Sequence, residues 1–110
     1  MGAAPAARRK TMRDVPEALL ADAKNYLDMT WPDASADQKL RGILERGMAY
    51  LDHRAGTSLD YEEEGDARAL LLDYARYAQA FALQDFGTDY ASELLGLHIA
   101  GEVEQHGGIP

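Results

Sequence analysis

The strongest constraint on the fold of this chain is the imbalance between its helix-forming and its β-branched residues. Leu and Ala supply 33 of the 110 residues, whereas Val, Ile and Thr together supply nine. Leu and Ala lose little freedom on entering a helix, and β-branched residues are those that suit the pleated surface of a sheet. We therefore predict an all-α fold. At this length the chain has room for one domain with a modest core.

Apolar spacing predicts a compact bundle of about four helices, at residues 14–29, 35–56, 67–83 and 89–105. The second has the clearest buried stripe, which consists of Leu40, Ile43, Leu44, Met48 and Leu51. The connecting loops are short enough for antiparallel neighbours.

Helix ends are predicted from residues that can satisfy free backbone groups. Four polar residues are placed to accept hydrogen bonds from the amides at the helix starts: Asp14, Ser35, Asp66 and Thr88. Glu17 and Gln38 stand at the capping-box positions of the first two helices. Gly56 is expected to end the second helix in a left-handed conformation, and Phe86-Gly87 to interrupt the chain before the last helix.

The predicted helix at 67–83 is apolar on two faces. One face consists of Ala67, Leu70, Leu71, Tyr74, Ala78 and Phe81, and the other of Leu72, Ala75 and Ala82. Such a helix is either central to the fold or shared with another subunit. Tyrosines recur near the core stripes, at Tyr26, Tyr50, Tyr74, Tyr77 and Tyr90. Because a four-helix core needs less apolar surface than these supply, their number favours a subunit interface.

Charge is unevenly spread along the chain, whose net charge is −8. Residues 1–13 contain four bases and no acid, at Arg8, Arg9, Lys10 and Arg13. The remainder holds seven Lys and Arg against 19 Asp and Glu. We predict a flexible basic arm at 1–13, a helical domain at 14–106 and a tail at 107–110. Because DNA-gripping domains depend on clustered bases, the acidic body is unlike one, although the arm could contact nucleic acid or an acidic neighbour.

Histidines supply the best candidate for a metal site. His98, Glu102 and His106 share one face of the last predicted helix. A fourth ligand and a zinc-binding motif are missing, so we expect solvated side chains there. His53 is expected to complement the C-terminal end of its helix rather than to act as a base. We predict that the chain binds no metal.

The acidic loop between the second and third helices could suggest calcium or paired catalytic carboxylates. It contains Asp60, Glu62, Glu63 and Glu64. The ligand spacing of a calcium loop is absent, so a solvated, helix-capping cluster is the preferred interpretation. The chain has no cysteine, no Gly-rich phosphate loop and no Ser-His-acid pattern. We therefore predict neither enzymatic activity nor a cofactor.

Two further expectations concern the surface of the domain. Trp31, the one tryptophan, precedes Pro32 in a loop, where it either plugs one end of the bundle or anchors a partner. No apolar run approaches the roughly 20 residues of a membrane span, and Arg8-Arg9 is not followed by a hydrophobic signal segment. We predict no membrane contact.

The order of these features resembles that of the small head-to-tail connector, or adaptor, proteins of tailed phages. The resemblance extends from residue 20 to residue 104. In its first half it rests on Tyr26-Leu27, Thr30-Trp31-Pro32-Asp33, Asp37-x-x-Leu40, Ile43-Leu44 and Ala49-Tyr50-Leu51 before Gly56. In its second half it rests on Leu70-Leu71-Leu72, Tyr74-x-Arg76-Tyr77, Asp85-Phe86, Tyr90, Ser92-Glu93-Leu94 and Leu97.

The resemblance implies a structural virion protein located where the head joins the tail. Such a subunit is assembled in the host cytoplasm into a ring, typically of twelve, below the portal protein. The ring also contacts a stopper or tail-completion protein and leaves a passage for double-stranded DNA that it does not bind sequence-specifically. The residues expected at subunit or partner contacts are Trp31, Leu72, Tyr74, Arg76, Tyr77 and Tyr90.

A different class of function stays open beside this one. A small helical regulatory or DNA-associated module would use the basic arm, Arg8, Arg9, Lys10 and Arg13, to bind nucleic acid. The arm has no interleaved aromatic side chains to stack on bases, so sequence-specific recognition is the less favoured role.

Overall fold

In the computed structural model the described residues are 14–105, and they form five α-helices and no strand. The helices are α2 (Glu17–Tyr26), α3 (Ala34–Ala55), α4 (Asp66–Gln79), α5 (Leu83–Asp89) and α6 (Ala91–Gln105). The all-α prediction is therefore confirmed, and the predicted number of four helices is one too small. The predicted arm at 1–13, His106 and the tail at 107–110 lie outside the described residues.

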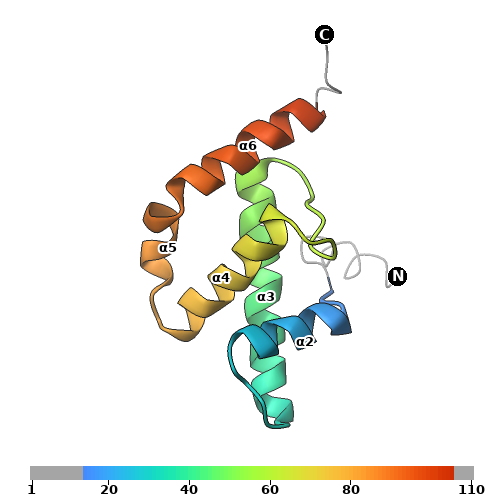
Figure 1. Ribbon diagram of the computed structural model, residues 1–110. Helices are drawn as coiled ribbons and strands as arrows, with labels where there is room; N and C mark the ends of the chain where they lie inside the picture. The colour runs from blue at the N-terminus through green and yellow to red at the C-terminus, as the bar shows by residue number, and fades with distance from the viewer. Residues whose placement is uncertain (1–13, 106–110) are drawn as a thin grey trace, which may run out of the picture.

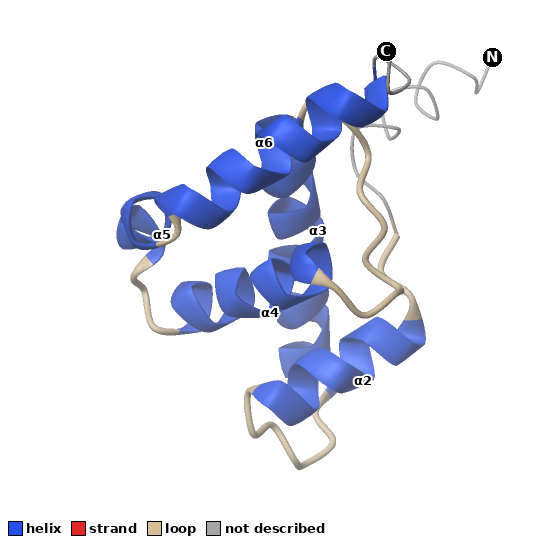
Figure 2. Cartoon of the chain, turned by 45° about the horizontal axis from the view of Figure 1, so that its top comes forward, coloured by secondary structure: helices blue, strands red, loops and turns tan. Residues whose placement is uncertain are grey.

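The long helix α3 is the axis on which the other elements are arranged. Helices α4 and α6 both pack across it, and α2 lies against α3 and α4 (Figure 1). The short helix α5 joins α4 to α6 on one side, so α4 and α6 stand apart along much of their length (Figure 2). The helices of the predicted bundle thus pack around α3, and α4 and α6 diverge from this shared support.

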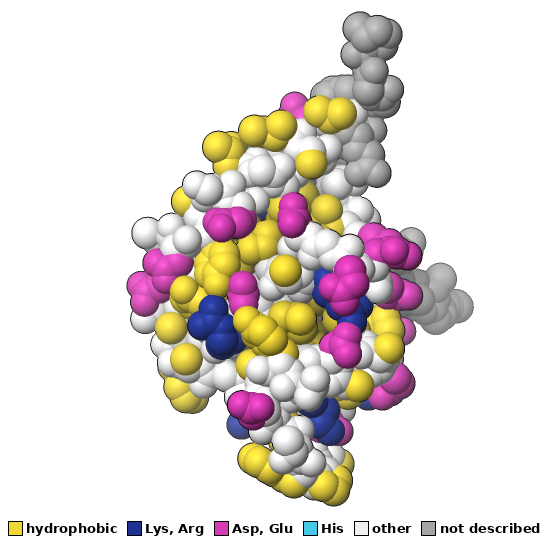
Figure 3. Space-filling model, viewed as in Figure 1, with side chains coloured by type: hydrophobic (Ala, Val, Ile, Leu, Met, Phe, Trp, Pro, Cys, Tyr) yellow, Lys and Arg dark blue, Asp and Glu magenta, His cyan; other side chains and the backbone are white. Residues whose placement is uncertain are grey.

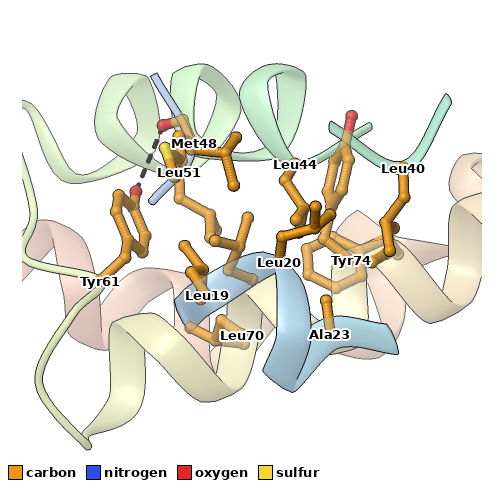
Figure 4. Close-up of a cluster of buried hydrophobic side chains, with 14 of the residues drawn as sticks. Leu19, Leu20, Ala23, Leu40, Leu44, Met48, Leu51, Tyr61, Leu70 and Tyr74 are labelled. Carbon is orange, nitrogen blue, oxygen red and sulfur yellow. Dashed lines mark hydrogen bonds between the residues drawn. The ribbon is translucent and has the colours of Figure 1, made fainter. Parts of the chain in front are cut away.

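The core lies between α3 and the helices that cross it. The predicted stripe of α3 is buried at Leu40, Leu44, Met48 and Leu51, with Ile43 partly buried. Leu19, Leu20 and Ala23 of α2 and Leu70, Leu71 and Ala75 of α4 close over this stripe (Figure 4). Complete burial of a leucine side chain stabilises a fold by roughly 1.5–3 kcal/mol, so this cluster is the main source of stability.

The predicted N-caps are wrong by one or two positions. Helix α3 is capped by Asp33, whose Oδ1 accepts hydrogen bonds from the amides of Ser35 (3.0 Å) and Ala36 (3.2 Å). Asp33 is extended, with φ −159°, and so its carboxylate reaches back over the first turn. Helices α2 and α4 begin after Pro16 and Gly65 without a side-chain cap. Asp66 instead lies in the first turn of α4, where the helix dipole favours an anion.

Three helices end in the same way, with a left-handed residue that reverses the chain. These residues are Asp28 after α2 (φ 60°), Gly56 after α3 (φ 77°) and Phe81 after α4 (φ 57°). At the end of α4 the amide of Phe81 donates to the carbonyl of Ala78 (3.1 Å) and that of Ala82 to the carbonyl of Tyr77 (2.8 Å). This pair of bonds is a Schellman motif. Only the glycine was predicted, because the other two side chains are uncommon at such positions.

The Schellman motif at Phe81 corrects the predicted third and fourth helices. Helix α4 ends at Gln79 rather than near Leu83, since a left-handed residue cannot continue it. Phe86 and Gly87 do not interrupt the chain but lie inside α5. Thr88 is likewise a residue of α5, and no side-chain cap precedes that helix.

Candidate interaction surfaces

The tyrosines predicted to be in excess pack largely on one another within a single copy. Phe86 of α5 is 1% exposed and lies among Tyr50, Tyr74, Tyr77 and Tyr90, with ring centroids 4.7–5.9 Å apart. Most of these ring pairs are edge-to-face, the arrangement that aromatic quadrupoles favour. This role of Phe86 differs from the predicted one, in which Phe86-Gly87 interrupts the chain before the last helix. Much of the aromatic surface is therefore used inside the fold.

Polar atoms of the same tyrosines form the outer edge of this cluster. Tyr26 donates its hydroxyl proton to Asp73, and Arg76 Nη2 donates to the Tyr90 hydroxyl at 3.0 Å. Tyr77 donates to Asp89 Oδ2 at 2.6 Å, and this hydrogen bond raises the pKa of Tyr77 to about 12. The bond favours the protonated phenol beside a carboxylate. These contacts tie α2, α4 and the end of α5 together at the surface.

The predicted contact residues fall into two groups in the structure. Tyr74 is buried at 8% exposure, and Leu72, Tyr77 and Tyr90 are partly buried. Arg76 is exposed, and Trp31 is 61% exposed in the loop between α2 and α3. Of the two roles considered for Trp31, plugging the end of the bundle is not what this indole does within one copy.

Helix α6 carries an exposed apolar face that the sequence analysis did not single out. Its inner side is buried at Leu94, Leu97 and Gly101. Its outer side presents Leu95, Ile99 and Val103 at 58%, 55% and 58% exposure. These residues recur every four positions, so they form one stripe along the helix. Their spacing is visible in the sequence, but spacing alone does not show which side of the helix is exposed.

Small uncharged residues extend the stripe on one side, and the exposed Glu102 borders it on the other. The exposed Gly96 and Ala100 lie beside the stripe at the edge of a groove between α4 and α6, and a Cβ added to Gly96 would meet no atom within 4 Å. A glycine in a helix interior costs roughly 1 kcal/mol relative to alanine, and nothing in one copy requires it here. Figure 3 shows hydrophobic side chains along the upper edge of the molecule, over α6. We call the three residues of the stripe, together with Gly96 and Ala100, the α6 apolar face.

A groove of about 410 Å³ separates α4 from α6. Its lining includes the apolar Leu70 and Leu97, with the carboxylates of Asp66, Asp73 and Glu93 around it. Acidic and hydrophobic side chains alternate over this region in Figure 3. The groove follows from the divergence of the two helices, because α5 holds their ends apart.

The acidic loop between α3 and α4 is anchored by a buried residue that was overlooked. Tyr61 is 3% exposed, and its hydroxyl donates to Asp52 Oδ1 at 2.7 Å. The amide of Leu59 donates to the same oxygen at 3.0 Å. Arg68 Nη1 donates to the carbonyls of Tyr61 (3.1 Å) and Glu62 (3.0 Å). The burial of Tyr61 was not predicted, because the acidic residues around it indicate an exposed loop.

The histidines lie at the surface of the described residues. His98 Nε2 is 3.7 Å from Glu102 Oε2, both side chains are more than half exposed, and His106 lies outside the described residues. His53 is exposed in the last turn of α3. Between residues 14 and 105 no group of three or more His, Cys, Asp or Glu side chains is arranged to hold a metal ion. In the same part of the chain no helix has the length and apolarity to span a bilayer.

No protein-family model, curated protein or solved structure matches this chain.

Proposed function

We propose that the chain is a structural subunit of the head-to-tail connector of a tailed phage. The single structural observation that carries this proposal is the α6 apolar face, Leu95, Gly96, Ile99, Ala100 and Val103. Contiguous exposed apolar surface of this kind is typical of sites that bind another protein. The series of motifs that resembles connector proteins supplies the particular assembly.

In this proposal twelve copies form a ring, which lies beneath the portal protein and above a stopper or tail-completion protein. The apolar face of α6 packs against a neighbouring subunit or the portal. Exposed Trp31 and Arg76 contact partners directly, whereas Tyr74, Tyr77 and Tyr90 act by holding α4, α5 and α6 in position. Leu72 of α4 is partly buried, so in this proposal it both packs within one copy and contacts a partner.

The charge of the domain is compatible with a passage for DNA. The residues after the arm hold seven bases and 19 acids. An acidic wall repels phosphates, so double-stranded DNA would pass without adhering. We place the assembled protein in the virion, at the interface of head and tail.

Light scattering after size-exclusion chromatography tests the proposal. The full chain is measured alone and with the portal protein encoded in the same genome. We expect a complex of defined stoichiometry with the portal that Ile99→Glu weakens at least tenfold, because the substitution places a charge in an apolar contact.

Gln84→Glu is the matched control, since Gln84 is exposed on α5, away from the α6 apolar face, and the substitution adds the same charge. A chain that stays monomeric and ignores the portal contradicts the proposal. A band shift with duplex DNA that is lost when Arg8, Arg9, Lys10 and Arg13 are replaced by Ala would favour the DNA-associated module instead.

A further inference from the structure

We infer that the outward face of α3 binds the acidic loop of a second copy of this chain. The inference rests on the proposed function, because it takes copies to join head to tail, and it identifies the charged surfaces that meet. We call Lys39, Arg46 and Arg54 the α3 basic face, and Asp60, Glu62, Glu63, Glu64 and Asp66 the acidic loop.

The basic face is defined by the cations that the fold leaves without a carboxylate. Four of the seven Lys and Arg among residues 14–105 are paired, in Lys24–Asp37 (2.9 Å), Arg41–Glu17 (2.7 Å), Arg68–Asp22 and Arg76–Asp73 (3.5 Å). The other three form no ion pair with a carboxylate in that part of the chain, and all three belong to α3. In a domain with so many acids, cations without acidic neighbours are the exception.

These three cations project from one side of the helix. Lys39 and Arg46 are seven residues apart, which is two turns, and Arg54 follows eight residues later. The buried stripe formed by Leu40, Leu44 and Leu51 lies on the adjoining side of the helix, and Arg54, the cation nearest to it, donates from Nη1 to the Tyr50 hydroxyl at 3.0 Å. At about 1.5 Å per residue, neighbouring charges are about 10–12 Å apart along the axis.

The surface between Lys39 and Arg46 is hollowed. A shallow depression of about 380 Å³ is lined by Ser35, Gln38, Lys39, Gly42 and Arg46. Gly42 has no side chain to fill it, and Arg46 Nη1 lies 3.3 Å from where a Cβ on Gly42 would be. A protruding anionic segment can therefore bind in this depression between Lys39 and Arg46, next to the neutral hydrogen-bond donors of Ser35 and Gln38.

The acidic loop has the complementary properties. Its carboxylates are exposed, and of the five only Glu64 approaches a cation, with its Oε2 4.0 Å from Arg68 Nε. The backbone beneath them is held in place by the bonds of Tyr61 and Arg68 described above. Binding such a preorganised segment costs little conformational entropy.

The two surfaces of one copy point in different directions. The acidic loop is held beside Met48 and Asp52 of α3, because the Tyr61 hydroxyl contacts the Met48 carbonyl (3.2 Å) and Asp52 Oδ1 (2.7 Å). At 3.6 residues per turn, these two positions are on the side of α3 opposite to Lys39. They therefore cannot satisfy each other within one copy. A contact between two different surfaces is heterologous, and repetition of such a contact generates a closed ring when the rotation allows closure.

A nucleic acid is the less favoured occupant of the basic face. Beyond residue 13 the chain has 12 more acidic than basic residues, and this field repels a polyanion at long range. A short acidic loop can reach the face without bringing a continuous line of phosphates against the remaining carboxylates. A band shift with duplex DNA that depends on Lys39 and Arg46 would overturn the inference.

Charge reversal in the full chain tests the contact. K39E/R46E replaces the two cations beside the depression by acids, and E62K/E63K changes the charge of the acidic loop from −5 to −1. D85K/E102K is the control for E62K/E63K, because it makes the same change of charge at exposed positions elsewhere. Each variant is examined by sedimentation velocity over a range of concentrations in 25, 100 and 300 mM NaCl. Circular dichroism and urea unfolding confirm that each variant is folded.

We expect the wild-type chain and D85K/E102K to associate at 25 mM NaCl, and each of the other two variants alone to associate at least tenfold more weakly. An equimolar mixture of the two variants should associate again, because the unaltered acidic loop of K39E/R46E can bind the unaltered basic face of E62K/E63K. Association should weaken as salt increases, since these charges are exposed.

Covalent trapping provides a second measurement. The chain has no cysteine, so R46C and E63C chains can be mixed and oxidised to form one kind of heterodisulfide. We expect R46C to couple with E63C faster than with E102C. The inference is overturned if R46C couples with E63C and with E102C at equal rates and the mixture of charge variants does not associate. It is also overturned if the chain is monomeric in both experiments. A complex with the portal that forms despite those results would leave the proposed function standing.

Discussion

At the scale of single residues, two glycines of α6 differ in what surrounds them. A Cβ added to Gly101 would collide with the backbone carbonyl oxygen of Ala55, at the point where α6 crosses the end of α3. A Cβ added to Gly96 would meet nothing. The first glycine is required by the fold of one copy and the second is not.

Gly101→Ala should lower the free energy of unfolding by about 2 kcal/mol or more, because backbone atoms of α3 and α6 would have to separate. Gly96→Ala should raise it by up to about 1 kcal/mol, because alanine is the better helix former. Urea unfolding followed by circular dichroism measures both. Equal effects of the two substitutions would contradict the close crossing of the helices.

Tyr77 should make stability depend on pH in the alkaline range. Its pKa rises from 10.0 to about 12 in the folded protein, chiefly through the hydrogen bond to Asp89. A phenol with a raised pKa stabilises the fold fully below pH 10, and that contribution is lost as pH rises to 12. Urea midpoints measured from pH 9 to pH 12 should fall less steeply in Tyr77→Phe than in the wild type.

Asp89→Asn provides the control for that experiment. It keeps an oxygen acceptor near the Tyr77 hydroxyl but removes the negative charge that disfavours the phenolate. Its slope should lie between those of the wild type and Tyr77→Phe. If all three slopes coincide, the hydrogen bond from Tyr77 to Asp89 does not influence folding.

At the scale of elements, the junction between α4 and α5 shows how one residue redirects the chain. Phe81 is 89% exposed and has a φ of 57°. A left-handed backbone costs a non-glycine residue roughly 1–2 kcal/mol, and so exposed a ring recovers little of it by packing. The predicted helix extends to Leu83 because a phenylalanine is not expected in the left-handed conformation that ends α4 at Gln79.

Phe81→Gly should therefore raise the free energy of unfolding by about 0.5–1 kcal/mol, since the gain in the left-handed turn exceeds the extra freedom of glycine in the unfolded chain. Ala80→Gly should lower it, because Ala80 has a φ of −89°, which suits an L-residue. Thermal unfolding by calorimetry compares the two. A destabilised Phe81→Gly variant would show that the ring contributes to packing after all.

The surfaces available to partners also depend on how the elements are placed. The helix predicted at 67–83 was expected to be central or shared between subunits, and in the structure α4 is enclosed by α2, α3 and α5. Its second apolar face is used at Ala75, which is 0% exposed. The large unpartnered apolar surface lies on α6 instead, where one side packs on α3 and the other faces outward.

At the scale of the whole molecule, the excess of acidic residues should oppose folding at low ionic strength. The domain after residue 13 has 19 acids and seven bases, and most of the acids are exposed. Screening reduces repulsion among them, since the Debye length falls from about 30 Å at 0.01 M salt to about 10 Å at 0.1 M.

The melting temperature should therefore rise by a few degrees between 10 and 200 mM NaCl, measured by calorimetry at neutral pH. The E62K/E63K variant, in which the charge of the acidic loop falls from −5 to −1, should show a smaller rise. A melting temperature that falls with added salt would mean that the four ion pairs outweigh the general repulsion. Association through the α3 basic face should have the opposite salt dependence, so the two effects can be separated.

The sequence by itself determined the all-α class, the buried stripe of α3 and the left-handed end at Gly56. These features depend on local propensity and on the periodicity of apolar residues, which are written along the chain. It did not locate the ends of α4, the helix α5 or the burial of Tyr61, because each depends on contacts between distant segments.

Only the tertiary structure decided which apolar and charged surfaces stay exposed. Leu71 and Leu95 have the same chemistry, yet one is buried against α3 and the other is 58% exposed. Lys24 and Lys39 differ in the same way, since one has Asp37 beside it and the other forms no ion pair with a carboxylate among the described residues. The physical reason is that the rest of the fold determines which side chains are covered and which stay available to a partner. The periodicity of apolar residues does not specify these contacts between distant segments.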